Sequence, residues 1–462
     1  MIRSVYQGII YIQAWEFILI PVYLFIIFLI ASRIKNSRIV KDPVYKYYLF
    51  GLYAKIIGGL AFAMIYIYYY DGGDTMTYYE TGRAMVNMFY KDPLMYFKVL
   101  FGPNSKEIYQ AFDLQTGLLV GYVFSDPKTF MVCRLISPLL IITFNSYILA
   151  TILVSWVTYS GLWRLYLLFV RYFPEIQYKL AIAILFFPSV VFWGSGIMKD
   201  SFTMAATGWY VFYINYVFIR KHYGFRALLI LFISAFVLIS LKPYIFMVLF
   251  PGTLYWVFNA RAKRIRNKLV RYMLLPVTYV LVIFGSIFLL ESLGSMLGKF
   301  SLDEALETAV VSQKDLKSDH YQGNSFDIGE FEPTVAGVLS KMLPAVNAGM
   351  FRPYIWEANN AAMLGSGLEN LFLMVLSMLI LIRTRVVYFI AYSFSDPLVM
   401  FCLLFSICFA FVIGLTTSNF GALVRFKIPL LPFFVSGLFI VDHLNKERLA
   451  RKKFGLRRRT EN

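Results

Sequence analysis

The chain has 462 residues, of which 59% are hydrophobic and only 15% charged, and it carries a formal net charge of +18. Soluble globular chains hold roughly 45–50% apolar and about 25% charged residues, so the composition excludes an ordinary soluble domain. The positive charge lies in short clusters beside apolar runs, which is typical of membrane-protein loops. A nucleic-acid partner is therefore not expected.

Apolar runs of the length needed to cross a bilayer, about 20 residues, recur along the whole chain. They predict an all-α, polytopic transmembrane helix bundle, one transmembrane domain over residues 1–462, with about ten or eleven spanning helices. The first run is too long for a signal-peptide core and is followed by basic residues, so we expect it to be retained. In chain order, the expected spans are 9–32, 47–70, 146–168, 180–195, 202–219, 227–241, 244–259, 272–291, 367–382, 397–415 and 427–442.

Basic clusters occupy alternate segments between these runs, and the positive-inside rule assigns such segments to the cytoplasm. The N-terminus is then outside, and residues 443–462 form a basic cytoplasmic tail in contact with membrane lipids. Residues 71–130 and 292–366 become two outer loops with short interfacial helices. Apolar residues at helical spacing predict such a helix over 75–101, and charge counting makes 130–144 interfacial or re-entrant.

Several charged residues fall at one depth, near the outer ends of the expected spans, where ionisable groups are costly and often functional. They come from at least five separate turns, which favours a common outer cavity over isolated helix ends. Each alone could instead be a solvated turn residue or a snorkelling anchor. The set is Asp71, Asp74, Lys199, Asp200, Lys242, Arg352, Arg425 and Lys427.

The three cysteines and three histidines of the chain offer no disulfide framework and no metal-ligand spacing. The remaining candidate for a divalent metal is the carboxylate pair of Asp71 and Asp74, in the turn Asp-Gly-Gly-Asp. A carboxylate fixed in that turn could equally take a proton from a hydroxyl group as a general base.

Three short motifs carry a resemblance to a known superfamily. The segment 73–79, Gly-Asp-Thr-Met-Thr-Tyr-Tyr, resembles the first outer-loop motif of C-type (GT-C) membrane glycosyltransferases. The stretch 187–201 contains the pair Pro188-Ser189, the aromatic pair Phe192-Trp193 and the pair Lys199-Asp200. It is similar to a stretch in bacterial envelope proteins of this type. The segment 424–433, Val-Arg-Phe-Lys-Ile-Pro-Leu-Leu-Pro-Phe, resembles the opening of a late helix in several such transferases.

The resemblance implies transfer of a sugar from a polyprenyl-phosphate-linked donor to a glycan or lipid-linked acceptor at the outer face, in a bacterial inner membrane. Asp74 would be the catalytic base and Asp71 would assist it. No cofactor is required by this chemistry. The donor phosphate would meet Arg425, Lys427, Lys199, Lys242 and Arg352. The acceptor would meet Tyr78, Tyr79 and Asp200.

The sequence departs from the superfamily in two ways. The first long outer loop follows the second expected helix rather than the first, and the two acidic residues are separated by two glycines. The spacing leaves open which aspartate is the base. Three alternatives remain: a polymerase of lipid-linked repeat units, a lipid or glycan transporter, and a scaffold subunit without chemistry.

Overall fold

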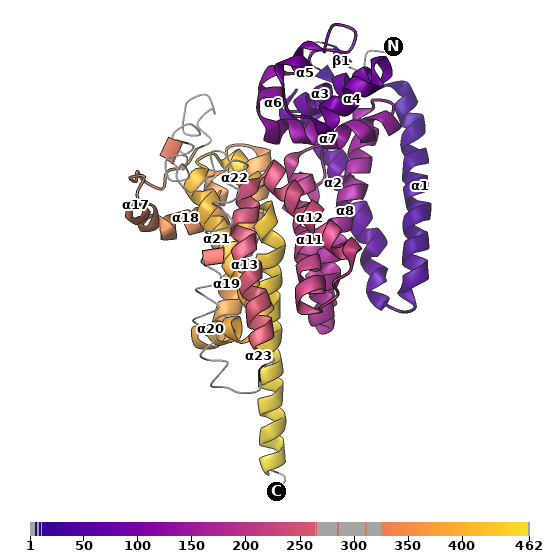
Figure 1. The fold of residues 1–462 in the computed structure, drawn as a ribbon. Helices are drawn as coiled ribbons and strands as arrows, with labels where there is room; N and C mark the ends of the chain where they lie inside the picture. Colours follow the sequence, from indigo (N-terminus) through magenta and orange to yellow (C-terminus); the bar gives the residue numbers. More distant parts are fainter. Residues whose placement is uncertain are drawn as a thin grey trace. The chain divides into compact units, whose positions relative to one another are not determined.

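The computed structural model describes residues 5–6, 9–10, 12–263, 265, 284–285, 310–311 and 325–460. Apart from one short antiparallel pair, β1 (Val5–Tyr6) and β2 (Ile9–Ile10), the regular elements in these ranges are helices (Figure 1). The all-α class is therefore confirmed. The predicted span 272–291 and the predicted loop 292–366 as far as Asn324 lie almost entirely outside the described residues.

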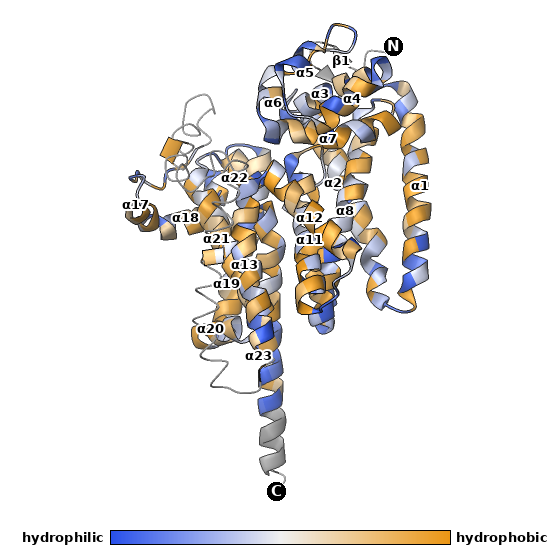
Figure 2. Ribbon diagram, in the orientation of Figure 1, coloured by the Kyte–Doolittle hydropathy of each residue, from blue (hydrophilic) through white to orange (hydrophobic). Residues whose placement is uncertain are grey.

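Six helices in these ranges are long and apolar enough to cross a membrane, which supports an integral membrane protein. Each corresponds to a span expected from the sequence, and Figure 2 shows hydrophobic residues along most of α2, α8 and α21. The six are α1 (Ala14–Ile39), α2 (Tyr48–Tyr68), α8 (Tyr147–Tyr172), α19 (Ala361–Thr384), α21 (Pro397–Thr416) and α23 (Leu431–Thr460).

The other described spans do not combine this length with this hydropathy, so length and composition single out fewer spans than the sequence predicts. The span near 180–195 is divided into α9 (Gln177–Leu185) and α10 (Pro188–Trp193). Pro188 has no amide hydrogen, so it fits the first turn of α10 and disfavours the continuation of α9. The next helices are α11 (Lys199–Ile214), prolonged by a π-helical turn over Asn215–Ile219, α12 (Phe225–Leu241) and α13 (Pro243–Ala262).

The chain divides into two compact units. The first comprises Met1–Leu167, Val190–Trp209 and Ile233–Lys242. The second comprises Leu168–Ser189, Tyr210–Phe232 and Pro243–Asn462.

In the first unit, short helices gather at one end of α2 and α8 (Figure 1). The predicted interfacial helix 75–101 is two helices, because Asp92 and Pro93 end one and begin the next. The Asp92 side chain accepts a hydrogen bond from the Met95 amide at 3.0 Å and so caps the second helix. The helices are α3 (Asp74–Lys91), α4 (Pro93–Phe101), α5 (Lys106–Gln110), α6 (Gly121–Ser125) and α7 (Pro127–Ile142).

Small residues bring the long helices of the first unit into backbone contact. A methyl group on Gly161 of α8 would overlap the carbonyl oxygen of Ala205 of α11, and one on Gly58 of α2 would overlap that of Val191. Close approach at small residues is how helices associate in a membrane, where burial of apolar surface gives little driving force. These contacts fix α11, and hence its first residue Lys199, relative to α2 and α8.

The second unit packs α21 against α13, α23 and α18 (Met342–Phe351). Gly414 of α21 and Gly349 of α18 each leave no room for a side chain beside the backbone of the other helix. Two predicted connections contain helices: α20 (Val386–Ser395) lies within 383–396, and α22 (Phe420–Phe426) lies within 416–427. The predicted tail 443–462 continues α23 as a helix through Thr460.

Candidate functional site

The turn after α2 separates the two aspartates of the Asp-Gly-Gly-Asp motif. Asp71, Gly72 and Gly73 all have positive φ angles, of 47°, 146° and 103°, so the chain reverses within three residues. A side chain on Gly73 would come within 3.0 Å of the Tyr66 ring. Asp71 is exposed on this turn, whereas Asp74 is half-buried as the first residue of α3, where the helix dipole favours a carboxylate.

A second anchored residue is Lys199, at the start of α11. Its ammonium donates a hydrogen bond to the Thr129 hydroxyl at 2.6 Å, and it lies 3.6 Å from the Asp126 carboxylate. The Thr129 hydroxyl in turn donates to Asp126. Lys199 is thus tied to the first turn of α7.

The backbone that leads to Lys199 is fixed by groups of α2 and α8. The buried ammonium of Lys55 donates to the Gly194 carbonyl, and the Ser155 hydroxyl donates to the Ser195 carbonyl at 2.8 Å. A side chain on Gly196 would overlap the Phe62 ring. The Gly-Ser-Gly sequence therefore lets residues 194–196 lie close to α2 and α8, which larger residues would prevent.

Asp200 and Lys242 form a buried ion pair, with 2.5 Å between the carboxylate and the ammonium. Their side chains are 3% and 6% exposed, so the pair is shielded from water. Removing one partner would leave an uncompensated buried charge. The sequence predicted that Asp200 binds the acceptor and that Lys242 binds the donor phosphate. In the structure the two side chains are ion-pair partners of each other.

Four charged groups interact electrostatically with Lys199: Asp126, Lys242, Asp74 and Asp200. The structure therefore brings together four residues that the sequence had suggested, namely Asp74, Lys199, Asp200 and Lys242. With Asp126 added, we call them the first-unit charge cluster.

Sequence reasoning missed Asp126 and Thr129. The only local signal is Asp126 before Pro127, which is typical of a helix N-cap, and Asp126 does cap α7 by accepting from the Lys128 amide at 3.1 Å. Burial alone would raise the pKa of Asp126, but the Thr129 hydrogen bond and the positive charge of Lys199 outweigh it. The pKa of this carboxyl group is held below its usual range.

The predicted acceptor residues Tyr78 and Tyr79 lie inside the first unit, with exposures of 4% and 0%. The Tyr79 hydroxyl donates to the Asn145 carbonyl at 2.5 Å, and its ring meets the Tyr147 ring edge-on. The structure therefore places Tyr79 in the packing of α3 against α8 rather than on an open surface.

The carboxylate pair Asp71 and Asp74 is the candidate for a divalent metal that the sequence offered. Within the described ranges, no group of three or more His, Cys, Asp or Glu side chains is placed to hold a metal ion.

The remaining predicted cations belong to the second unit. Lys427 is fully buried, and its ammonium donates to the Asn370 side chain and, at 3.4 Å, to the Arg352 carbonyl. The Arg352 guanidinium pairs with Glu357 and lies 4.7 Å from the centre of the Phe326 ring. Arg425 is half-buried in the last turn of α22. The predicted donor-binding set is thus divided between the units, and Lys427 and Arg352 have protein partners of their own.

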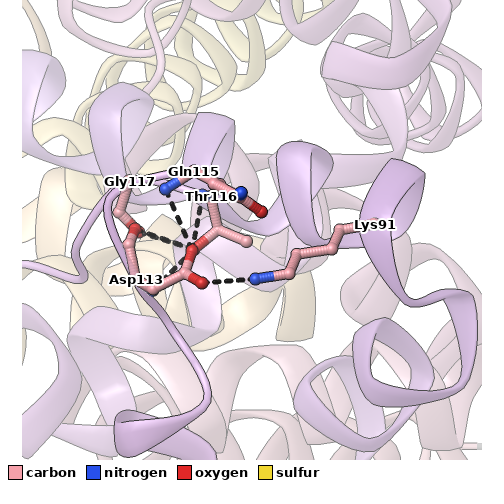
Figure 3. A network of polar contacts seen from close by, with 5 residues as sticks. All are labelled: Lys91, Asp113, Gln115, Thr116 and Gly117. Carbon is pink, nitrogen blue, oxygen red and sulfur yellow. Dashed lines mark hydrogen bonds and ion pairs between the residues drawn. The ribbon is translucent and has the colours of Figure 1, made fainter.

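Another polar network holds the loop of the first unit between α5 and α6 (Figure 3). The Asp113 carboxylate accepts from the amides of Gln115 and Thr116, both at 3.0 Å, and pairs with Lys91 at the end of α3. The Lys91 contact, followed by the amide hydrogen bonds, lowers the pKa of Asp113 to about 2. This network ties the loop to α3, which begins with Asp74.

Comparison of the chain with protein-family models, with curated proteins and with solved structures gave no match.

Proposed function

We propose that the protein is a membrane glycosyltransferase that moves a sugar from a polyprenyl-phosphate-linked donor to a glycan or lipid-linked acceptor. The reaction would take place at the outer face of the membrane, with the first-unit charge cluster as the active site. The observation that carries this proposal is the electrostatic interaction of a half-buried carboxylate, Asp74, with an anchored ammonium, Lys199, each of which is the first residue of its helix.

The proposed step needs one base and one cation. The oxygen of the acceptor hydroxyl forms a bond to the anomeric carbon of the donor sugar, and Asp74 accepts the proton of that hydroxyl. The bond from that carbon to the phosphate oxygen breaks, and its electron pair leaves with the polyprenyl phosphate. Lys199 then compensates the negative charge that develops on the departing phosphate.

Two features favour this function over transport. Transporters tend to place ionisable residues near the membrane midplane, between repeats. Here the cluster gathers where α3, α7 and α11 begin, and the buried Lys55 within α2 is used to hold the Gly194 carbonyl. Two rivals remain: a polymerase of lipid-linked repeat units, which would need a similar base and phosphate site, and a scaffold subunit without chemistry.

The test is deletion of the gene, followed by mass spectrometry of lipid-linked sugars and surface glycans. We expect a glycan that lacks one sugar residue and an accumulated polyprenyl-phosphate sugar. Wild-type protein should restore the profile, whereas Asp74→Asn should not, because a general base contributes about 10²- to 10⁴-fold to the rate. Asp71→Asn, on the exposed turn, should reduce transfer less.

The controls are equal membrane abundance of each variant and the Glu107→Gln variant, which removes an exposed carboxylate outside the cluster. Accumulated single repeat units would identify a polymerase. An unchanged glycan profile, or full rescue by Asp74→Asn, would contradict the proposed site.

A further inference from the structure

The Lys199 ammonium has hydrogen-bonding capacity that the described residues do not use. A lysine ammonium carries three N–H donors, yet among the described residues only Thr129 accepts from it. The Asp126 carboxylate, at 3.6 Å, is an ion contact too long for a hydrogen bond. The Lys199 side chain is also 19% exposed. Two donors are therefore open to the oxygen atoms of a ligand.

Asp126 does not depend on Lys199 for its own position. Its carboxylate accepts from the Lys128 amide and from the Thr129 hydroxyl, and it is 47% exposed. If Lys199 moved away, Asp126 would keep both hydrogen bonds and would be hydrated. Partly exposed ion pairs contribute little to stability, so this contact can be exchanged for another at small cost.

The charges around Lys199 single out Asp126 as the exchangeable partner. Asp200 and Lys242 are buried and neutralise each other at 2.5 Å. Asp74 acts on Lys199 more weakly than Asp126 does. An anion that approaches Lys199 would therefore compete first with the Asp126 carboxylate.

We propose that Asp126 is a placeholder for the phosphate of a polyprenyl phosphate, and that this phosphate displaces Asp126 from Lys199 when the ligand binds. The inference rests on the proposed function and adds a positioning residue to it. Asp126 and Thr129 hold the ammonium where the phosphate will arrive, and two phosphate oxygens take the two open donors. Asp126 then remains as the cap of α7.

The test is the binding of a sugar-free polyprenyl monophosphate to the full-length protein in phosphatidylcholine nanodiscs, titrated by native mass spectrometry. Asp126→Asn keeps the helix cap, because asparagine caps as well as aspartate does, but it removes the competing charge. We expect the Kd to fall about two- to fivefold, the range of a partly exposed ion pair. A residue with a merely structural role would raise the Kd or leave it unchanged when replaced.

Two variants make the result specific. Glu107→Gln also removes a carboxylate that pairs with a lysine, Lys98, in the same outer segment, and it should leave the Kd unchanged. The double variant Lys199→Gln with Asp126→Asn should bind the polyprenyl phosphate no more tightly than Lys199→Gln alone, because the tighter binding acts through Lys199. Inorganic phosphate and phosphatidylglycerol, used as alternative probes, should not compete at equal concentration.

A second measurement follows the side chain itself. Amine labelling of Lys199, read by peptide mass spectrometry, should increase in Asp126→Asn and decrease when the polyprenyl phosphate is bound. Binding by the wild type with an equal or weaker Kd in Asp126→Asn would overturn this inference and leave the proposed function in place. Absence of binding by the wild type would overturn both, and competition by phosphatidylglycerol would overturn the choice of a polyprenyl ligand.

Discussion

Asp113 shows how single residues hold the loop beside the candidate site (Figure 3). Its folded-state pKa, about 2, lies below the ordinary value of 3.8, chiefly because of Lys91. A group with a depressed pKa stabilises the folded state fully above its unfolded pKa. That contribution is lost as the pH falls through the window from 3.8 to about 2.

We therefore predict that Asp113→Asn loosens the loop between α5 and α6 at neutral pH. Hydrogen exchange of residues 106–120, measured for both proteins at each pH, should be faster in the variant. The difference should shrink as the pH falls from 3.8 toward 2, because the wild-type carboxylate is progressively protonated and becomes neutral like the asparagine. A difference that stays constant down to pH 2 would show that the charge of Asp113 does not hold the loop.

The buried charges of the spanning helices are satisfied by polar groups of the backbone and of neighbouring side chains. Lys55 donates to the Gly194 carbonyl, and Glu16 accepts from the Ser146 hydroxyl. Lys427 donates to the Asn370 side chain in the second unit. Each contact joins segments distant in sequence, so these residues determine which helices meet as well as carrying charge.

At the scale of helices, α18 and α21 meet through small residues spaced four apart. Ala345 and Gly349 lie on α18, and Ala410 and Gly414 lie on α21. A methyl group on Gly414 would overlap the Ala345 carbonyl oxygen, and one on Gly349 would overlap that of Ala410. The crossing therefore depends on the absence of side chains at both glycines.

We predict that Gly414→Ala destabilises the protein by about 1–3 kcal/mol, the usual cost of overpacking, because the two helices must separate. Thermal unfolding in detergent measures this as a lower Tm. Gly365→Ala in α19 is the matched control, because a methyl group there meets nothing within 4 Å. It should keep or raise the Tm, since alanine is favoured over glycine in helices by up to about 1 kcal/mol. Equal Tm values for the two variants would contradict the close crossing.

For the whole molecule, the sidedness predicted from charge is open to a direct test. Ser125 lies in the predicted outer loop 71–130, Ser37 lies in the basic segment 33–46 near the C-terminal end of α1, and both are exposed. In a background without native cysteines, a membrane-impermeant maleimide should label Ser125→Cys in intact cells. Ser37→Cys should react only after the membrane is permeabilised. Labelling in the opposite order would place the candidate site in the cytoplasm and exclude a reaction at the outer face.

The sequence was sufficient for features that depend on composition along one segment. Apolar length predicted α1, α2, α8, α19, α21 and α23, because each needs only enough hydrophobic residues to match a bilayer. It was insufficient where helices break. The division of 180–195 depends on Pro188 and on contacts of the following glycines, so hydropathy alone could not reveal it.

The sequence by itself determined that this is a helical membrane protein with charged residues at the ends of its spans, because both follow from which residues are adjacent in the chain. Only the tertiary structure decided which charges share a site. It joined Lys199 to Asp126 and Thr129, which are about 70 residues away, and it placed Tyr79 in the interior. It also gave Arg352 and Lys427 partners within the second unit. The reason is physical: helix packing and the need to satisfy buried polar groups select these partners, and neither is written in a local motif.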